Sequence, residues 1–81
     1  MPMEEIAVKT VRESILNSLL EIARDNKGTP SHIRHEMRMF LDALLLRPSM
    51  QRFFQLYGIP HDEFIRDIYD TAVSMLFDNG S

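Results

Sequence analysis

The sequence contains no cysteine and only three glycines among its 81 residues. The absence of cysteine excludes disulfides and thiolate zinc sites, and it fits a reducing cytoplasm. No apolar run approaches the roughly 18 residues that a membrane span requires. The first residues also lack the basic, apolar and small-residue order of a secretory signal. We therefore expect a cytoplasmic protein with no membrane partner.

An excess of basic residues is also missing. Nine lysines and arginines stand against twelve acidic residues, and the formal net charge of −3 argues against a protein that coats nucleic acid. The sequence has no nucleophile elbow and no glycine-rich phosphate loop. A chain of this length also has little volume for a closed pocket. We expect no enzyme, no cofactor and no small-molecule substrate.

The residues that are present describe an ordinary globular chain, with 44% apolar and 26% charged residues. Turn-forming residues gather at 26–30, 47–49 and 58–60, and no stretch shows the period of two that a strand would give. The sequence predicts an all-α, compact four-helix domain over residues 1–81, packed as an orthogonal or irregular bundle. Its three longer helices and one short third helix are expected at about 2–25, 30–46, 48–57 and 60–78.

Particular residues are expected to end these helices. Thr29 or Ser31 is a suitable N-cap for the second helix, because a hydroxyl oxygen can accept a free backbone N–H of the first turn. Gly28 and Gly58 follow the first and third helices, and glycine adopts the left-handed conformation at little cost.

Apolar residues recur at helical spacing in all four segments, which predicts one inward face for each helix. The predicted inward residues are Val8, Val11, Ile15, Leu19, Ile22, Ile33, Met37, Phe40, Leu41, Leu44, Leu45, Met50, Phe53, Phe54, Tyr57, Phe64, Ile65, Ile68, Tyr69, Ala72, Met75 and Leu76.

A second apolar stripe lies on the opposite side of the second helix and consists of Met39, Ala43 and Leu46. A helix that is apolar on two sides is either surrounded within its own domain or shared with another chain. Here the short third helix either covers the stripe or leaves it free as an interface, and we favour the interface. Leu56 could extend the same patch.

The short length of the chain is a reason to interpret the stripe as an interface. Below roughly 80 residues a core alone gives little stability, and oligomerisation often supplies the rest. Our main hypothesis is a non-enzymatic protein–protein interaction module or adaptor that self-associates as a homodimer, or else binds another protein. The expected interface residues are Met39, Ala43, Leu46 and Leu56, with Arg38 and Arg47 at the rim.

An alternative hypothesis is a small dimeric nucleic-acid-associated regulator. Its binding patch would consist of Arg34, Arg38, Arg47 and Arg52. The third helix, however, is mostly apolar, whereas a recognition helix presents polar side chains to base edges. A protein-docking patch or a solvated basic face is therefore the preferred interpretation of these arginines.

A weak candidate metal site is formed by His32, His35 and Glu36, which are neighbours on one helical face. The order of these residues matches no familiar zinc motif. The preferred interpretation is an exposed first turn in which Glu36 pairs with His32 or with a nearby arginine.

Charge is segregated along the chain. Residues 30–60 carry four arginines against two carboxylates, whereas residues 61–81 carry one arginine against five carboxylates. The acidic last helix could meet the basic second helix of another copy. The two helices could equally be neighbours within one chain, or both could be solvated, and the sequence leaves these alternatives open.

Overall fold

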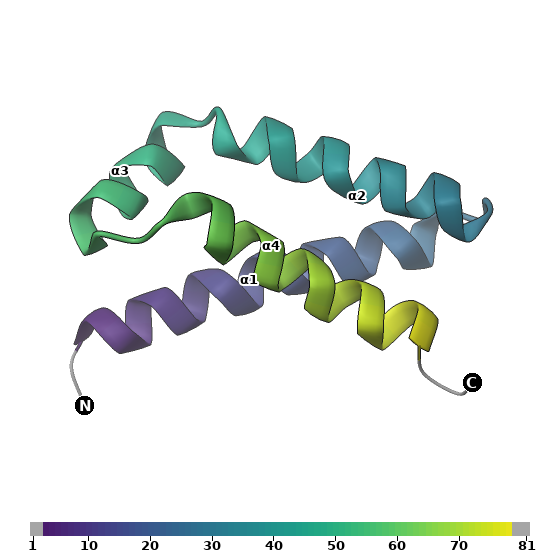
Figure 1. Ribbon diagram of the computed structural model, residues 1–81, viewed down its shortest axis with the longest axis horizontal. Helices are drawn as coiled ribbons and strands as arrows, with labels where there is room; N and C mark the ends of the chain where they lie inside the picture. The colour runs from purple at the N-terminus through teal and green to yellow at the C-terminus, as the bar shows by residue number, and fades with distance from the viewer. Residues whose placement is uncertain (1–2, 79–81) are drawn as a thin grey trace.

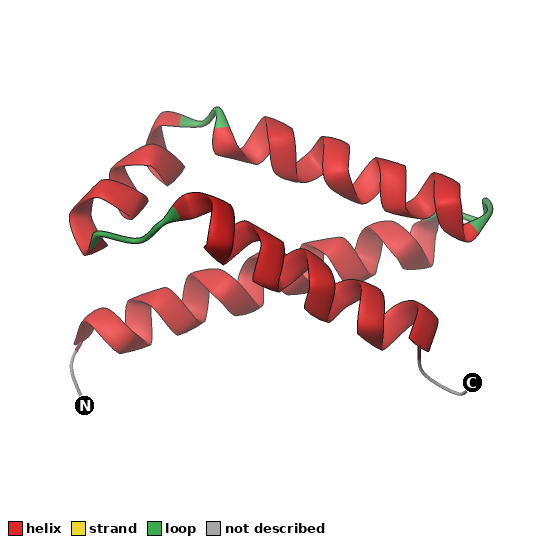
Figure 2. Cartoon of the chain, in the orientation of Figure 1, coloured by secondary structure: helices red, strands yellow, loops and turns green. Residues whose placement is uncertain are grey.

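The computed structural model describes residues 3–78, which form four α-helices and one π-helical segment (Figure 1). The elements are α1 (Met3–Asp25), α2 (Pro30–Leu45), α3 (Pro48–Tyr57), α4 (His61–Val73) and η1 (Ser74–Asp78). The described residues contain no strand (Figure 2). The predicted all-α four-helix domain is therefore confirmed. The expected start of the first helix at residue 2 lies outside the described residues.

Two of the predicted helix ends are confirmed. Thr29 is the N-cap of α2, and its Oγ1 accepts a hydrogen bond from the backbone N–H of His32 at 3.2 Å. Gly58 ends α3 in the left-handed conformation, with φ of 62°. The chain can then turn sharply, and the N–H of Ile59 donates to the carbonyl oxygen of Phe54 at 2.9 Å.

The expected left-handed conformation of Gly28 is wrong. Gly58 is the only residue with positive φ in the part of the chain that the structure describes. The end of α1 is completed by an asparagine instead, because the backbone N–H and the side-chain amide of Asn26 both donate to the carbonyl oxygen of Ile22, at 3.1 and 2.9 Å. The side-chain amide is thus a second donor to a carbonyl that the backbone of Asn26 already satisfies.

The four helices fold back on one another (Figure 1). After α1, the chain returns along α2, turns at α3, and returns again through α4 across α1. Arg12 joins α1 to α4, because its Nε and Nη2 donate to Oδ2 of Asp67 at 3.1 and 3.0 Å. The same Nη2 donates to Oγ1 of Thr71 at 3.2 Å. This contact fixes the two helices at their crossing.

The core takes side chains from all four helices. The side chains of Leu19, Met37 and Ile68 are completely buried, and they bring α1, α2 and α4 together. Every fully buried residue belongs to a predicted inward face; the buried residues are Ile15, Leu19, Ile33, Met37, Leu41, Phe54, Ile65, Ile68 and Ala72. Among residues 3–78, no helix has both the length and the apolar character of a membrane span.

Aromatic side chains attach α3 to α4. The rings of Phe53 and Phe54 lie 6.0 and 5.7 Å from the ring of Phe64, and Phe53 also contacts Tyr57 at 5.3 Å between centroids. Edge-to-face aromatic pairs of this kind are favourable in addition to the area they bury. The apolar face of α3 is thus used against α4, which leaves the far side of α2 uncovered.

The last predicted helix is wrong in its final turn. We expected regular helix to residue 78 with Met75 inward, but α4 ends at Val73 and residues 74–78 are π-helical. A π-helix bonds residue i to i+5, so the apolar stripe moves forward along the sequence. Met75 is consequently 46% exposed, whereas Phe77 packs against the core.

Candidate functional site

The outer face of α2 carries an exposed apolar surface, the α2 stripe, which consists of Met39, Ala43 and Leu46. Met39 is 53% exposed and Leu46 is 78% exposed, and Ala43 between them is also exposed. Met37, only two positions from Met39, is completely buried. The helix therefore has two apolar sides, of which only one takes part in the core.

Polar residues continue the same face toward the start of α2. His32 lies seven positions before Met39, and seven residues are close to two helical turns. Nε2 of His32 lies 3.7 Å from Oε1 of Glu36. The outer face of α2 thus changes from polar at its first turns to apolar at its last.

The hypothesised metal site is not assembled. No group of three histidine, aspartate or glutamate side chains in residues 3–78 is arranged to hold a metal ion. The proximity of His32 and Glu36 corresponds to the preferred interpretation, an exposed first turn in which these two side chains lie together. His35 is exposed and takes no part in that pair.

Two of the four patch arginines turn toward α4 and η1. The guanidinium of Arg38 lies 5.1 Å from the centre of the Tyr69 ring, and that of Arg34 lies 5.5 Å from the centre of the Phe77 ring. An arginine over an aromatic face is attracted by the negative potential of the ring. The Arg38 contact shows that α2 and α4 are neighbours within one chain, which is one of the alternatives that the sequence left open.

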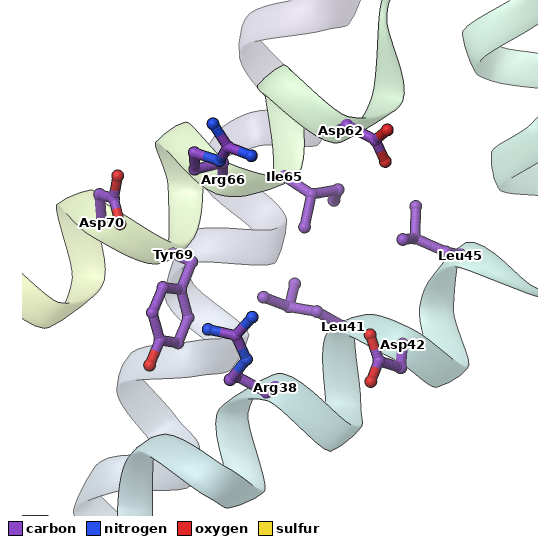
Figure 3. Close-up of a pocket in the computed structure, with 9 residues that line it drawn as sticks. All are labelled: Arg38, Leu41, Asp42, Leu45, Asp62, Ile65, Arg66, Tyr69 and Asp70. Atoms are coloured by element: carbon purple, nitrogen blue, oxygen red, sulfur yellow. The ribbon is translucent and has the colours of Figure 1, made fainter.

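The surroundings of Arg38 are unfavourable for a phosphate. Arg38 lines a groove of about 360 Å³ between α2 and α4, and Figure 3 shows it beside Tyr69 and Leu41. The groove carries three carboxylates, from Asp42, Asp62 and Asp70, against the guanidinium groups of Arg38 and Arg66. The carboxylates would repel an anion. Arg38 therefore lies on the α4 side of α2 rather than at the rim of the α2 stripe.

The other two patch arginines lie in different depressions. Arg47 lines a groove between α1 and α2 together with Ser14 and Phe40. Arg52 lines a depression on α3 together with Tyr57. The four arginines therefore do not form the single basic surface that binding along a nucleic-acid backbone requires.

Leu56 is 74% exposed but lies apart from the α2 stripe. It belongs to the end of α3 that is distant from the turn at residues 46–47, and it lines the α3 depression with Arg52 and Tyr57. No residue of α2 contributes to that depression. We therefore treat Leu56 as a separate apolar patch.

Some contacts were not predicted from the sequence. Arg12, Asp67 and Thr71 meet across 55 and 59 positions of the chain, and nothing local indicates such a pairing. Glu36 precedes Met39 by one helical turn, but from the sequence we interpreted it only as a metal ligand or as a local partner of His32 or an arginine.

The comparisons with known proteins give no relative. No protein-family model matches the chain, and neither a curated protein nor a solved structure does.

Proposed function

We propose that this chain is a non-enzymatic interaction module that self-associates as a homodimer through the α2 stripe. The observation that supports the proposal is the exposure of Met39 and Ala43 on α2 and of Leu46 at its C-cap, where neither α3 nor α4 covers them. Removing apolar surface from water is favourable by about 25 cal/mol per Å². Exposed apolar surface that is grouped rather than scattered is typical of interaction sites.

The shape of the α2 stripe favours a second copy as the partner. Ala43 is small and lies between two long side chains, so the same surface offers projections and a recess. A twofold interface requires one patch that is complementary to itself, and a stripe of this kind meets that requirement. The small core gives a further reason for association, because a chain of this length gains stability from a partner. The proposed place of action is the cytoplasm, on the basis of the cysteine-free composition.

The proposal is tested by placing a charge in the α2 stripe. Leu46→Asp would bury a carboxylate at the interface, and an unpaired buried charge is strongly unfavourable. We expect the native chain to sediment as a dimer at micromolar concentration and the variant to sediment as a folded monomer. We expect circular dichroism to show that the variant keeps its helices, because the exposed side chain of Leu46 is not part of the core.

Leu56→Asp is the matched control, since Leu56 is exposed to a similar extent on a different helix. We expect this variant to remain a dimer. A native chain that is monomeric at all accessible concentrations would overturn the proposal. Dissociation by Leu56→Asp together with no effect of Leu46→Asp would also contradict it, because the interface would then lie on α3.

The alternative function, a nucleic-acid-associated regulator, has weaker support because its arginines face different grooves. Its signature would be binding to DNA or RNA that weakens steeply as the salt concentration rises. We expect no such binding at low ionic strength, measured by fluorescence anisotropy with labelled duplex and single-stranded probes. Tight, salt-sensitive binding would favour the alternative.

A further inference from the structure

We propose that the two copies pair with their α2 helices antiparallel, so that Glu36 of each copy lies beside Arg47 of the partner subunit. The inference rests on the proposed function, because it assigns the orientation of the same interface. It goes further by naming the two charged residues that select this orientation over the parallel one.

Glu36 and Arg47 lie on the same flank of the α2 stripe. Glu36 belongs to α2, and Arg47 is the second residue after the end of that helix, where the backbone N–H groups of Leu46 and Arg47 donate to the carbonyl oxygens of Ala43 and Leu44. Phe40, one turn after Glu36, lines the groove between α1 and α2 together with Arg47. Both charges therefore flank the stripe on the side of α1. Asp42 lies on the opposite flank, in the groove toward α4.

The orientation follows from symmetry. In an antiparallel pair, the twofold axis is perpendicular to both helices, and each flank faces the same flank of the second copy. Glu36 near one end then meets an arginine, and Arg47 near the other end meets a glutamate. In a parallel pair each flank would face the opposite flank of the second copy, so Glu36 and Arg47 would not meet and this charge complementarity would be lost.

The apolar and charged contacts require the same register. Pairing Glu36 with Arg47 places the twofold axis midway between residues 41 and 42. Packing Met39 into the recess at Ala43 of the other copy places it at residue 41. The two positions differ by half a residue, which is less than about 1 Å along a helix that rises 1.5 Å per residue. One arrangement therefore satisfies both kinds of contact.

Neither Glu36 nor Arg47 forms a close ion pair with an arginine, lysine or carboxylate of its own chain within residues 3–78. The side chain of Glu36 is 38% exposed and its partner His32 is 3.7 Å away. Arg47 is exposed, and no carboxylate within residues 3–78 lies within ion-pair distance of its guanidinium. Both groups are therefore available to a second copy.

Charge reversal tests the orientation. We expect Glu36→Arg and Arg47→Glu each to raise the dimer dissociation constant by about tenfold, because each reversal makes two symmetric contacts repulsive. The double variant Glu36→Arg/Arg47→Glu should return the constant close to its native value, since both pairs are restored with opposite polarity. Sedimentation velocity over a concentration series measures all four proteins, and circular dichroism checks that each variant is folded.

Glu21→Arg and Arg24→Glu on α1 are the matched controls, because they change the net charge equally at exposed positions away from α2. These controls should leave the dissociation constant unchanged. Single reversals without effect, or a double variant that stays weak, would overturn antiparallel pairing while leaving self-association intact. Equal weakening by the controls would assign the effect to net charge and would overturn it too. A native chain that does not dimerise at all would contradict the proposed function itself.

Discussion

Two methionines on α2 show how strongly the environment of a side chain depends on helical phase. Met37 is completely buried, whereas Met39 is 53% exposed on the α2 stripe. Truncating a buried methionine typically costs about 2–5 kcal/mol, and an exposed substitution changes stability by about 0.5 kcal/mol or less. We expect Met37→Ala to lower the free energy of unfolding by about 2–5 kcal/mol and Met39→Ala to change it by about 0.5 kcal/mol or less. Urea unfolding at a concentration where the chain is monomeric measures both, and equal losses would contradict the assignment of the two faces.

Gly58 allows a test of backbone conformation without a change in packing. Its φ is 62°, and a Cβ added there would contact nothing within 4 Å. Gly58→Ala should therefore destabilise the fold by about 1–2 kcal/mol through the left-handed conformation alone. Gly58→Asn should lose less, because asparagine tolerates this conformation. If thermal unfolding shows the two variants to be equally stable, the turn does not depend on the left-handed conformation.

At the scale of elements, the ion pair of Arg12 adds a polar contact between α1 and α4 to their buried apolar packing. Its ion pair with Asp67 is partly solvated, with the two side chains 34% and 63% exposed. Exposed ion pairs contribute only about 0.2–1 kcal/mol, and salt screens them. We expect Arg12→Gln to lower the free energy of unfolding within that range in dilute buffer and by less in concentrated salt. Arg24→Gln on the same helix should have no such effect, and a large, salt-independent loss at Arg12 would mean that this residue mainly contributes packing.

The helices and their inward faces were largely predictable because they depend on local spacing. The buried residues Ile15, Leu41 and Ile68 all fall on predicted faces. The inward position predicted for Met75 was wrong, because the π-helical segment changes which side of the helix the apolar residues occupy in residues 74–78. The direction of Arg38 was also beyond prediction, since it depends on where Tyr69 of α4 packs against α2, and this is a property of the tertiary arrangement.

At the scale of the whole molecule, one short chain has a small core and a free apolar stripe. The sequence already contained the stripe as Met39, Ala43 and Leu46, but it could not show whether α3 would cover them. The structure shows that α3 uses its aromatic face against Phe64 of α4 instead. The candidate surface was therefore predictable in its residues, and only tertiary packing could establish that it is free.

Self-association should also appear in the stability of the chain. If two copies pair only when folded, the melting temperature rises with protein concentration, because binding to the native state shifts the unfolding equilibrium. We expect this rise for the native chain and not for Leu46→Asp. Calorimetry over a series of concentrations measures it, and identical melting curves for the native chain at all concentrations would contradict a dimer.

The most direct measurement is sedimentation equilibrium of the native chain and of Leu46→Asp, from low to high micromolar concentration. We expect the native chain to approach the mass of two 9.5-kDa chains and the variant to keep the mass of one. A native chain that keeps the mass of a single copy throughout would contradict self-association. A variant that dimerises as well as the native chain would contradict the role of the α2 stripe.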